Sequence, residues 1–173
     1  MISLLGCADR ILSSVYMTKT SYIFPVLVIN EAMANKVLVP LDGSERAFEA
    51  LEYAIEENPG AEITVLHALE FNEAASAEGT VILMDEGIRE AGESRAKKIF
   101  EEAQERAADI GYEGELTTVT EEGKPKRAIV EHAGDYDTVV MGSYGREGVG
   151  QKLLGSVAET VVRRSPVTVT VVR

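Results

Sequence analysis

The chain has 173 residues, a single cysteine and a formal net charge of −12. This length supports one domain with a sizeable core. The acidic excess disfavours binding to nucleic acid, because phosphates are repelled and no basic stripe with interleaved aromatic residues is present. The lone cysteine, Cys7, excludes an intrachain disulfide and a cysteine-based zinc site.

Residues 1–34 differ in composition from the rest of the chain, because their few charges sum to zero and no helical period is present. Their apolar stretch, 22–29, is too short for a bilayer, which needs roughly 20 residues. Ala32-Met33-Ala34 fits the cleavage site of a secretory signal, but the leading region is long and weakly basic. We expect residues 1–34 to be a disordered extension, or to precede a true start at Met33, and residues 35–173 to form the domain.

Strand patterns alternate with helix patterns in the first half of the domain. An apolar run predicts a strand over 36–41, and a second run predicts a strand over 63–69. Between them, apolar residues spaced i, i+3, i+4, i+7 predict a helix that ends before Asn58. The loop 70–84 is rich in small and acidic residues, so we expect it to be mobile. The apolar residues of the helix are Ala47, Ala50, Leu51 and Ala54.

The second half of the domain continues the alternation. A long helix should end at Gly111, and a short helix should carry Pro125 in its first turn. Strand patterns cover 116–120, 137–141 and 167–172, and a last helix is predicted over 156–164. Strands that alternate with helices indicate an α/β domain with a parallel sheet and helices on both faces. The apolar stripe of the long helix contains Ala96, Ile99, Phe100, Ala103, Ala107 and Ile110.

A glycine motif joins the fourth strand to the last helix. It consists of Gly142-Ser143-Tyr144-Gly145, nine intervening residues, and Gly155-Ser156. The segment 156–159 matches a capping box, with Ser156 as the N-cap. Helix N-termini present free N–H groups, and glycines let the backbone approach an anion, so the motif favours phosphate binding. The alternative is that the glycines end the strand and Ser156 only caps its helix.

The two histidines have no metal-ligand spacing, and no nucleophile lies in a recognisable triad motif. His67 falls inside an apolar run, where a hydrogen-bonded histidine in the core or at a strand end is the expected role. No catalytic base and no G-x-x-x-x-G-K-[ST] loop is evident, which disfavours a motor-type NTPase.

From residue 35 to residue 173 the chain resembles the nucleotide-binding branch of the universal stress protein family. The resemblance is carried by the segment 36–44, the spaced glycine motif and the segment 165–172. It implies a single open, Rossmann-like sheet of five parallel strands in the order 3-2-1-4-5. In that order the chain reverses direction between the first and fourth strands, and open α/β sheets bind ligands at such a crevice.

The resemblance also implies that ATP or another adenine nucleotide binds there with Mg²⁺. Asp42 should accept from ribose hydroxyls or hold Mg²⁺ through water, and its alternative role is to start a turn. Met141 either closes the floor of the site or belongs to the core. Arg146 either adds charge to the phosphate site or is solvated. The residues expected at the nucleoside are Pro40, Leu41, Asp42, Ala68, Met141 and Gly142. Those expected at the phosphates are Gly145, Arg146, Gly155, Ser156 and Val157.

The function that the resemblance implies is that of a cytoplasmic, ATP-binding stress-response regulator that hydrolyses ATP slowly if at all. One alternative is a dimeric interaction module without nucleotide. Another is an enzyme of the related α-hydrolase fold, such as a nucleotidyl transferase, but its H-x-G-H and S-G-G-x-D-S signatures are absent. Many relatives pair through the last strand, so a homodimer through 167–172 is expected, with Val167, Val169 and Val171 near the interface.

Overall fold

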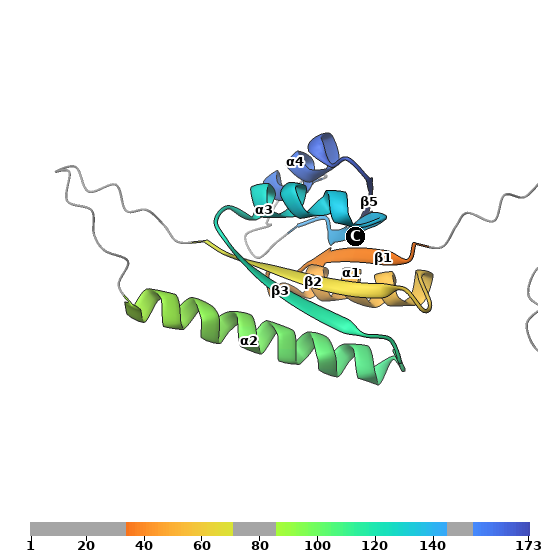
Figure 1. Cartoon of the computed structure of the whole chain (residues 1–173), viewed down its shortest axis with the longest axis horizontal. Coiled ribbons are helices and arrows are strands. Elements are labelled where there is room, and N and C mark those ends of the chain that lie inside the picture. Colours follow the sequence, from red (N-terminus) through yellow and green to blue (C-terminus); the bar gives the residue numbers. More distant parts are fainter. Residues whose placement is uncertain (1–33, 71–85, 145–153) are drawn as a thin grey trace, which may run out of the picture. The chain divides into compact units, whose positions relative to one another are not determined.

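The computed structural model describes residues 34–70, 86–144 and 154–173. Three predicted features lie wholly or mostly outside these ranges: the extension, of which residues 1–33 are not described, the loop predicted to be mobile, and the predicted phosphate contacts Gly145 and Arg146. Five strands and four α-helices form the described part (Figure 1). The strands are β1 (Lys36–Pro40), β2 (Glu62–Leu69), β3 (Leu116–Glu122), β4 (Thr138–Gly142) and β5 (Thr168–Val172). The helices are α1 (Glu45–Glu57), α2 (Glu86–Asp109), α3 (Pro125–His132) and α4 (Ser156–Arg164), with a 3₁₀ turn, η1 (Ala133–Asp135), after α3.

All five strands lie in one parallel sheet of order β3-β2-β1-β4-β5, which confirms the predicted fold. The central strand β1 has neighbours on both sides, because Val37 is in register with Ile63 of β2 and with Thr138 of β4. The predicted strand bounds agree with the structure to within two residues, and the largest difference is at β3, which ends at Glu122 instead of residue 120.

The helices cover both faces of the sheet, and each face has its own core (Figure 1). Successive residues of a strand point to opposite faces, so Val37 and Val39 pack with α1 and α2, while Leu38 packs with α3 and α4. The four apolar residues predicted for α1 are all buried, and Phe48 and Ile55 extend the same stripe.

Helix α2 ends one residue earlier than its apolar stripe predicts. Gly111 has φ of +75°, and the amide of Tyr112 donates to the carbonyl of Ala107, so the chain leaves the helix in a Schellman-type turn. Tyr112 therefore packs against the core and donates from its hydroxyl to the carbonyl of Ala61, whereas Ile110 is 39% exposed. The prediction of Gly111 as the stop is confirmed, and the assignment of Ile110 to the buried stripe is wrong.

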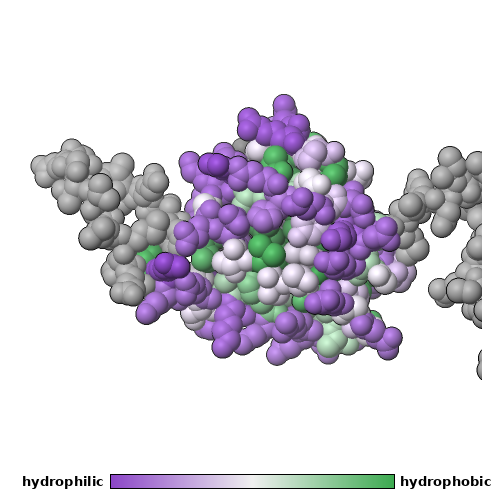
Figure 2. Space-filling view, in the orientation of Figure 1, coloured by the Kyte–Doolittle hydropathy of each residue, from purple (hydrophilic) through white to green (hydrophobic). Residues whose placement is uncertain are grey.

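Polar side chains cover most of the surface in the view of Figure 2, including the outward side of α2. Within the ranges that the structure describes, no helix combines the length and the hydropathy that crossing a membrane requires.

Candidate functional site

The carboxyl ends of β1 and β4 lie side by side at one edge of the sheet, and the two strands are followed by helices on opposite faces. Helix α1 follows β1 and packs on the face that carries α2. Helix α4 follows β4 and packs with α3 on the other face. The carboxyl ends of β1 and β4 therefore form a topological switch point, the place at which open α/β sheets have their ligand-binding crevice.

The end of β1 is held in place by β2. The amide of Leu41 donates to the carbonyl of Leu66 at 2.9 Å, and His67 donates from Nδ1 to the carbonyl of Leu41 at 2.6 Å. His67 is 4% exposed and meets the ring of Phe100 edge-on. It is thus the hydrogen-bonded core histidine that the sequence predicts, and it fixes the backbone from which the crevice loop begins.

Asp42 starts the turn that leads into α1. Its Oδ1 accepts from the Ser44 amide at 3.0 Å and from the Ser44 hydroxyl at 2.6 Å. Gly43, between them, has φ of +82°, a conformation that glycine adopts at little cost. Ser44 is in turn the N-cap of α1 and accepts from the amide of Ala47. The turn-forming role considered for Asp42 is therefore present, and its carboxylate is half-buried at the crevice.

Gly142, at the end of β4, lets the start of α1 pass close to the sheet. A Cβ at this position would lie 2.7 Å from the carbonyl oxygen of Arg46 and 3.2 Å from the amide nitrogen of Ala47. Both neighbours are backbone atoms, which cannot turn aside as a flexible side chain can. Gly142 thus has a packing role that the glycine motif does not reveal.

Helix α4 covers the residues predicted for it, 156–164, but its N-cap differs from the predicted one. Gly155 is the N-cap, because its carbonyl accepts the amide of Glu159 at 2.9 Å, and no side chain caps the helix. Ser156 is the first helical residue and is exposed. The prediction of a capping box with Ser156 as the cap is therefore wrong.

The N-terminus of α4 presents backbone donors that no hydrogen bond within the helix satisfies. The first amides of a helix have no partner inside it, and here those are the amides of Ser156, Val157 and Ala158. The amide of Gly155 donates to the carbonyl of Ser143 at 2.8 Å, which ties the start of the helix to the end of β4. The side chain of Val157 packs against the core beside α3, so only its backbone is available to a ligand.

Ser143 belongs to the glycine motif, and its backbone connects β4 to β5 and to the start of α4. Its amide donates to the carbonyl of Val172, and its carbonyl accepts from Gly155. Its hydroxyl is buried, with the residue only 1% exposed, and has no hydrogen-bond partner among the described residues. No sequence signal marks such an orphaned donor, whereas Ser44 could have been found as a helix cap directly before an acidic first turn.

Four other residues predicted to contact the nucleoside lie at the carboxyl ends of β1, β2 and β4, and they differ in how exposed their side chains are. The side chains of Leu41 and Met141 are buried in the two cores, so for Met141 the core role is present. Pro40 and Ala68 are half-buried at the ends of β1 and β2. Asp42 thus follows the end of β1, and Gly155 is bonded to Ser143 just after Gly142 at the end of the neighbouring strand β4. In the ranges described, no three histidine, cysteine or acidic side chains are grouped to hold a metal ion.

Comparison with known proteins agrees with this architecture. The family model described as "Universal stress protein family" matches residues 33–173. Universal stress protein MJ0531 of Methanocaldococcus jannaschii is 33% identical over 159 residues, which cover 88% of this chain and 90% of the relative. Universal stress protein YxiE of Bacillus subtilis is 33% identical over 151 residues, 82% of this chain and 100% of the relative. A crystal structure of a universal stress protein in complex with cAMP is 31% identical, with a TM-score of 0.60, and the match covers 82% of this chain and 99% of that one. The chain therefore belongs to the universal stress protein family.

Proposed function

We propose that this chain is an ATP-binding stress-response regulator, whose nucleotide state changes its conformation or its contacts with partners. The observation that carries the proposal is the N-terminus of α4, which has no side-chain cap in the described chain and follows β4, the strand beside β1 and its Asp42 turn. The relative in complex with cAMP supports an adenine nucleotide as the ligand.

The phosphate end of the site is built from backbone. The amides of Ser156 and Val157 offer donors, and the helix adds its partial positive charge. Gly155 carries no side chain that would cover these donors. The orphaned hydroxyl of Ser143 gives the same edge a further donor, which a bound water or a ligand oxygen would satisfy. Gly145 and Arg146 complete the proposed phosphate site.

The nucleoside end is built around Asp42. One carboxylate oxygen holds the turn, and the group can also accept from ribose hydroxyls or orient a water on Mg²⁺. Because Mg²⁺ is usually held by substrate phosphates, waters and one or two carboxylates, a single Asp42 fits this ion without an all-protein cage. Pro40, Ala68 and Gly142 would contribute contacts through exposed backbone and small side chains, while Leu41 and Met141 would contribute through backbone alone.

We expect slow hydrolysis or none. A general base must reach the attacking water, and His67, the histidine nearest to the Asp42 turn in the described chain, is buried with Nδ1 bound to the Leu41 carbonyl. The nucleotide would therefore act as a bound signal rather than as a substrate in turnover. A cytoplasmic location follows from this proposal, because ATP is available there.

We also propose a homodimer through β5. This strand pairs only with β4 in the described chain, so its outer edge carries unpaired backbone groups. Val167, Val169 and Val171 pack against the core beside α3 and α4, so the backbone of the edge, more than these side chains, would make the contact. A dimer that forms without nucleotide binding would instead favour the interaction-module alternative.

Calorimetric titration with ATP and Mg²⁺ tests the site, and Asp42 allows a sharp variant pair. Asp42→Asn keeps an oxygen that can accept from Ser44 but removes the charge, whereas Asp42→Ala removes both. If Asp42 binds the ligand, both variants should weaken ATP binding by about tenfold or more. If Asp42→Asn binds ATP as the parent does and only Asp42→Ala fails, Asp42 serves the turn alone. Absence of heat and of thermal stabilisation at millimolar ATP would refute the nucleotide proposal.

A further inference from the structure

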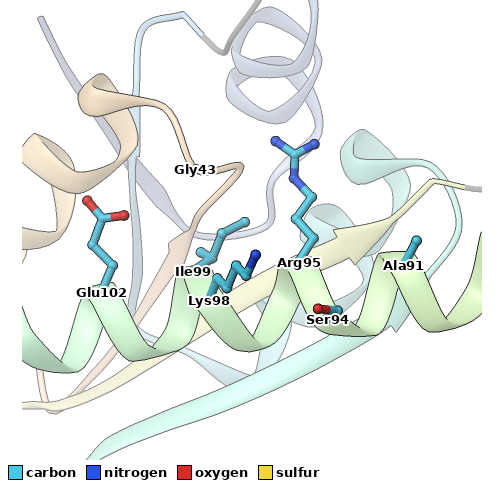
Figure 3. A pocket seen from close by; sticks show the side chains of 7 residues that line it. All are labelled: Gly43, Ala91, Ser94, Arg95, Lys98, Ile99 and Glu102. Atoms are coloured by element: carbon cyan, nitrogen blue, oxygen red, sulfur yellow. The ribbon is translucent and has the colours of Figure 1, made fainter.

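A pocket lies between the Gly43 turn and α2 (Figure 3). Its volume is about 420 Å³, and it is lined by Gly43 and by one side of α2 between Ala91 and Glu102. Two of its lining residues, Ala91 and Ser94, are small. It adjoins the nucleotide site through Gly43, which directly follows Asp42 in the chain.

Two cations on this wall have no carboxylate partner among the residues that the structure describes. Arg95 and Lys98 stand three residues apart on α2, so they share one side of the helix and repel each other. The residues three and four positions away from Arg95 include no acidic residue. Glu102 is four residues after Lys98, but it is bound to Arg106 at 3.0 Å. Neither Arg95 nor Lys98 forms an ion pair within the described ranges. Most other described cations do: Lys36, Arg46, Arg89, Lys97, Arg106, Arg127 and Arg163.

The Gly43 turn brings a backbone wall close to these charges. A Cβ at Gly43 would lie 3.2 Å from Ile99 and 4.0 Å from Nη2 of Arg95, so the guanidinium reaches the turn. Figure 3 shows Arg95 extended from α2 toward the level of this turn. A side chain at Gly43 is disfavoured by its φ of +82°, which keeps this wall of the pocket open.

We infer that this pocket binds a phosphate-type anion between Arg95 and Lys98. A guanidinium offers paired N–H donors that match phosphate oxygens, and the ammonium adds a compact charge. In a chain of net charge −12, two neighbouring cations without carboxylate partners in the described ranges concentrate positive potential at one place, and Glu102 in the same lining is paired with Arg106. The anion is either free in solution or a phosphate group of a nucleotide in the adjoining crevice. Only the second source rests on the proposed function.

Pyrophosphate is a suitable probe, titrated at low ionic strength while the amide signals of α2 are followed by NMR. The parent should bind it, and the double variant Arg95→Gln/Lys98→Gln should lose at least about tenfold in affinity. Lys97→Gln is the matched control, because Lys97 lies on the same helix but pairs with Glu101. Lys97→Gln should leave the response of the α2 signals to pyrophosphate unchanged. Glutamine is a good helix former, so α2 should persist in all these variants.

Two results would overturn the inference: a parent that does not bind pyrophosphate at this pocket, or a Lys97→Gln control as damaging as the double variant. Titration with ATP then separates the two sources. A loss of ATP affinity in the double variant would assign the anion to the nucleotide. Unchanged ATP affinity, with pyrophosphate binding still lost, would assign the pocket to a free anion. If the parent protein binds ATP but not pyrophosphate, the anion-binding role of this pocket is refuted, whereas the proposed function is not.

Discussion

Replacement of Gly142 by alanine should destabilise the protein, whereas the same replacement at Gly155 should do so much less. A Cβ at Gly142 would lie 2.7 Å from the Arg46 carbonyl oxygen, well inside van der Waals contact, and would push α1 away from β4. Overpacking of this kind costs about 1–3 kcal/mol. For a domain of this size that corresponds to a fall in melting temperature of about 3–12 °C.

Gly155 provides the contrast within the same motif. A Cβ there would lie 3.3 Å from the Ser143 carbonyl oxygen, which a shift of a few tenths of an ångström relieves. Its φ of −71° is open to any residue, so no backbone strain is added. Alanine is a poorer N-cap than glycine, which leaves an expected loss of about 1 kcal/mol at most. Both glycines were predicted to serve the ligand, and only the structure separates their roles.

Urea and thermal unfolding, followed by circular dichroism, measure both variants against the parent. An unchanged dependence of the unfolding free energy on urea would show that the unfolded states are comparable. If Gly142→Ala is as stable as the parent, or if Gly155→Ala is the less stable of the two, the close approach of α1 to β4 is wrong.

Three further predictions follow from the same geometry. Ser156→Asp should leave the unfolding free energy unchanged or slightly raised, because a carboxylate suits the first turn of α4. Calorimetry should show its ATP affinity falling by about tenfold or more, because the carboxylate repels the phosphates. Equal ATP affinity in Ser156→Asp and in the neutral Ser156→Asn would contradict this repulsion. Arg106→Gln should reduce stability by about 1–2 kcal/mol in urea unfolding, because Arg106 contacts Glu45, Glu52 and Glu102 and lies 4.4 Å from the Phe48 ring centroid. The hydrogen bond from Arg106 lowers the pKa of Glu45 below its ordinary 4.5, so this pair stabilises the fold above that pH and the contribution is lost on acidification. The unfolding free energies of parent and Arg106→Gln should therefore differ less near pH 3 than at neutral pH. An equal difference at both pH values would refute the linkage. Sedimentation velocity at micromolar concentrations should show a dimer, and a monomer would mean that the β5 edge is not a contact.

The strand and helix patterns were sufficient to predict a parallel α/β sheet, and the family resemblance supplied its strand order. Details that depend on one hydrogen bond were not predictable. The choice between Gly155 and Ser156 as N-cap depends on which carbonyl accepts the Glu159 amide. The exposure of Ile110 depends on the turn at Gly111, which brings Tyr112 to the core in its place.

Features that join distant segments were also beyond the sequence. Gly142 needs to be glycine because α1, which follows another strand, crosses it, and no local pattern records that approach. Arg95 and Lys98 look like part of a solvated helix face until α2 is packed against the Gly43 turn. The neighbours of a residue in space decide whether it packs, binds or is merely solvated.

The amide spectrum of the isotopically labelled protein, recorded as ATP and Mg²⁺ are added, tests the central claim most directly. If the crevice binds the nucleotide as proposed, the amide signals of Ser156, Val157 and the Asp42–Ser44 turn should shift together and saturate at one equivalent. The dissociation constant should be micromolar, which corresponds to a binding free energy on the order of −8 kcal/mol. Signals that stay in place at the start of α4, or shifts confined to another face of the sheet, would contradict the assignment of this edge as the nucleotide site.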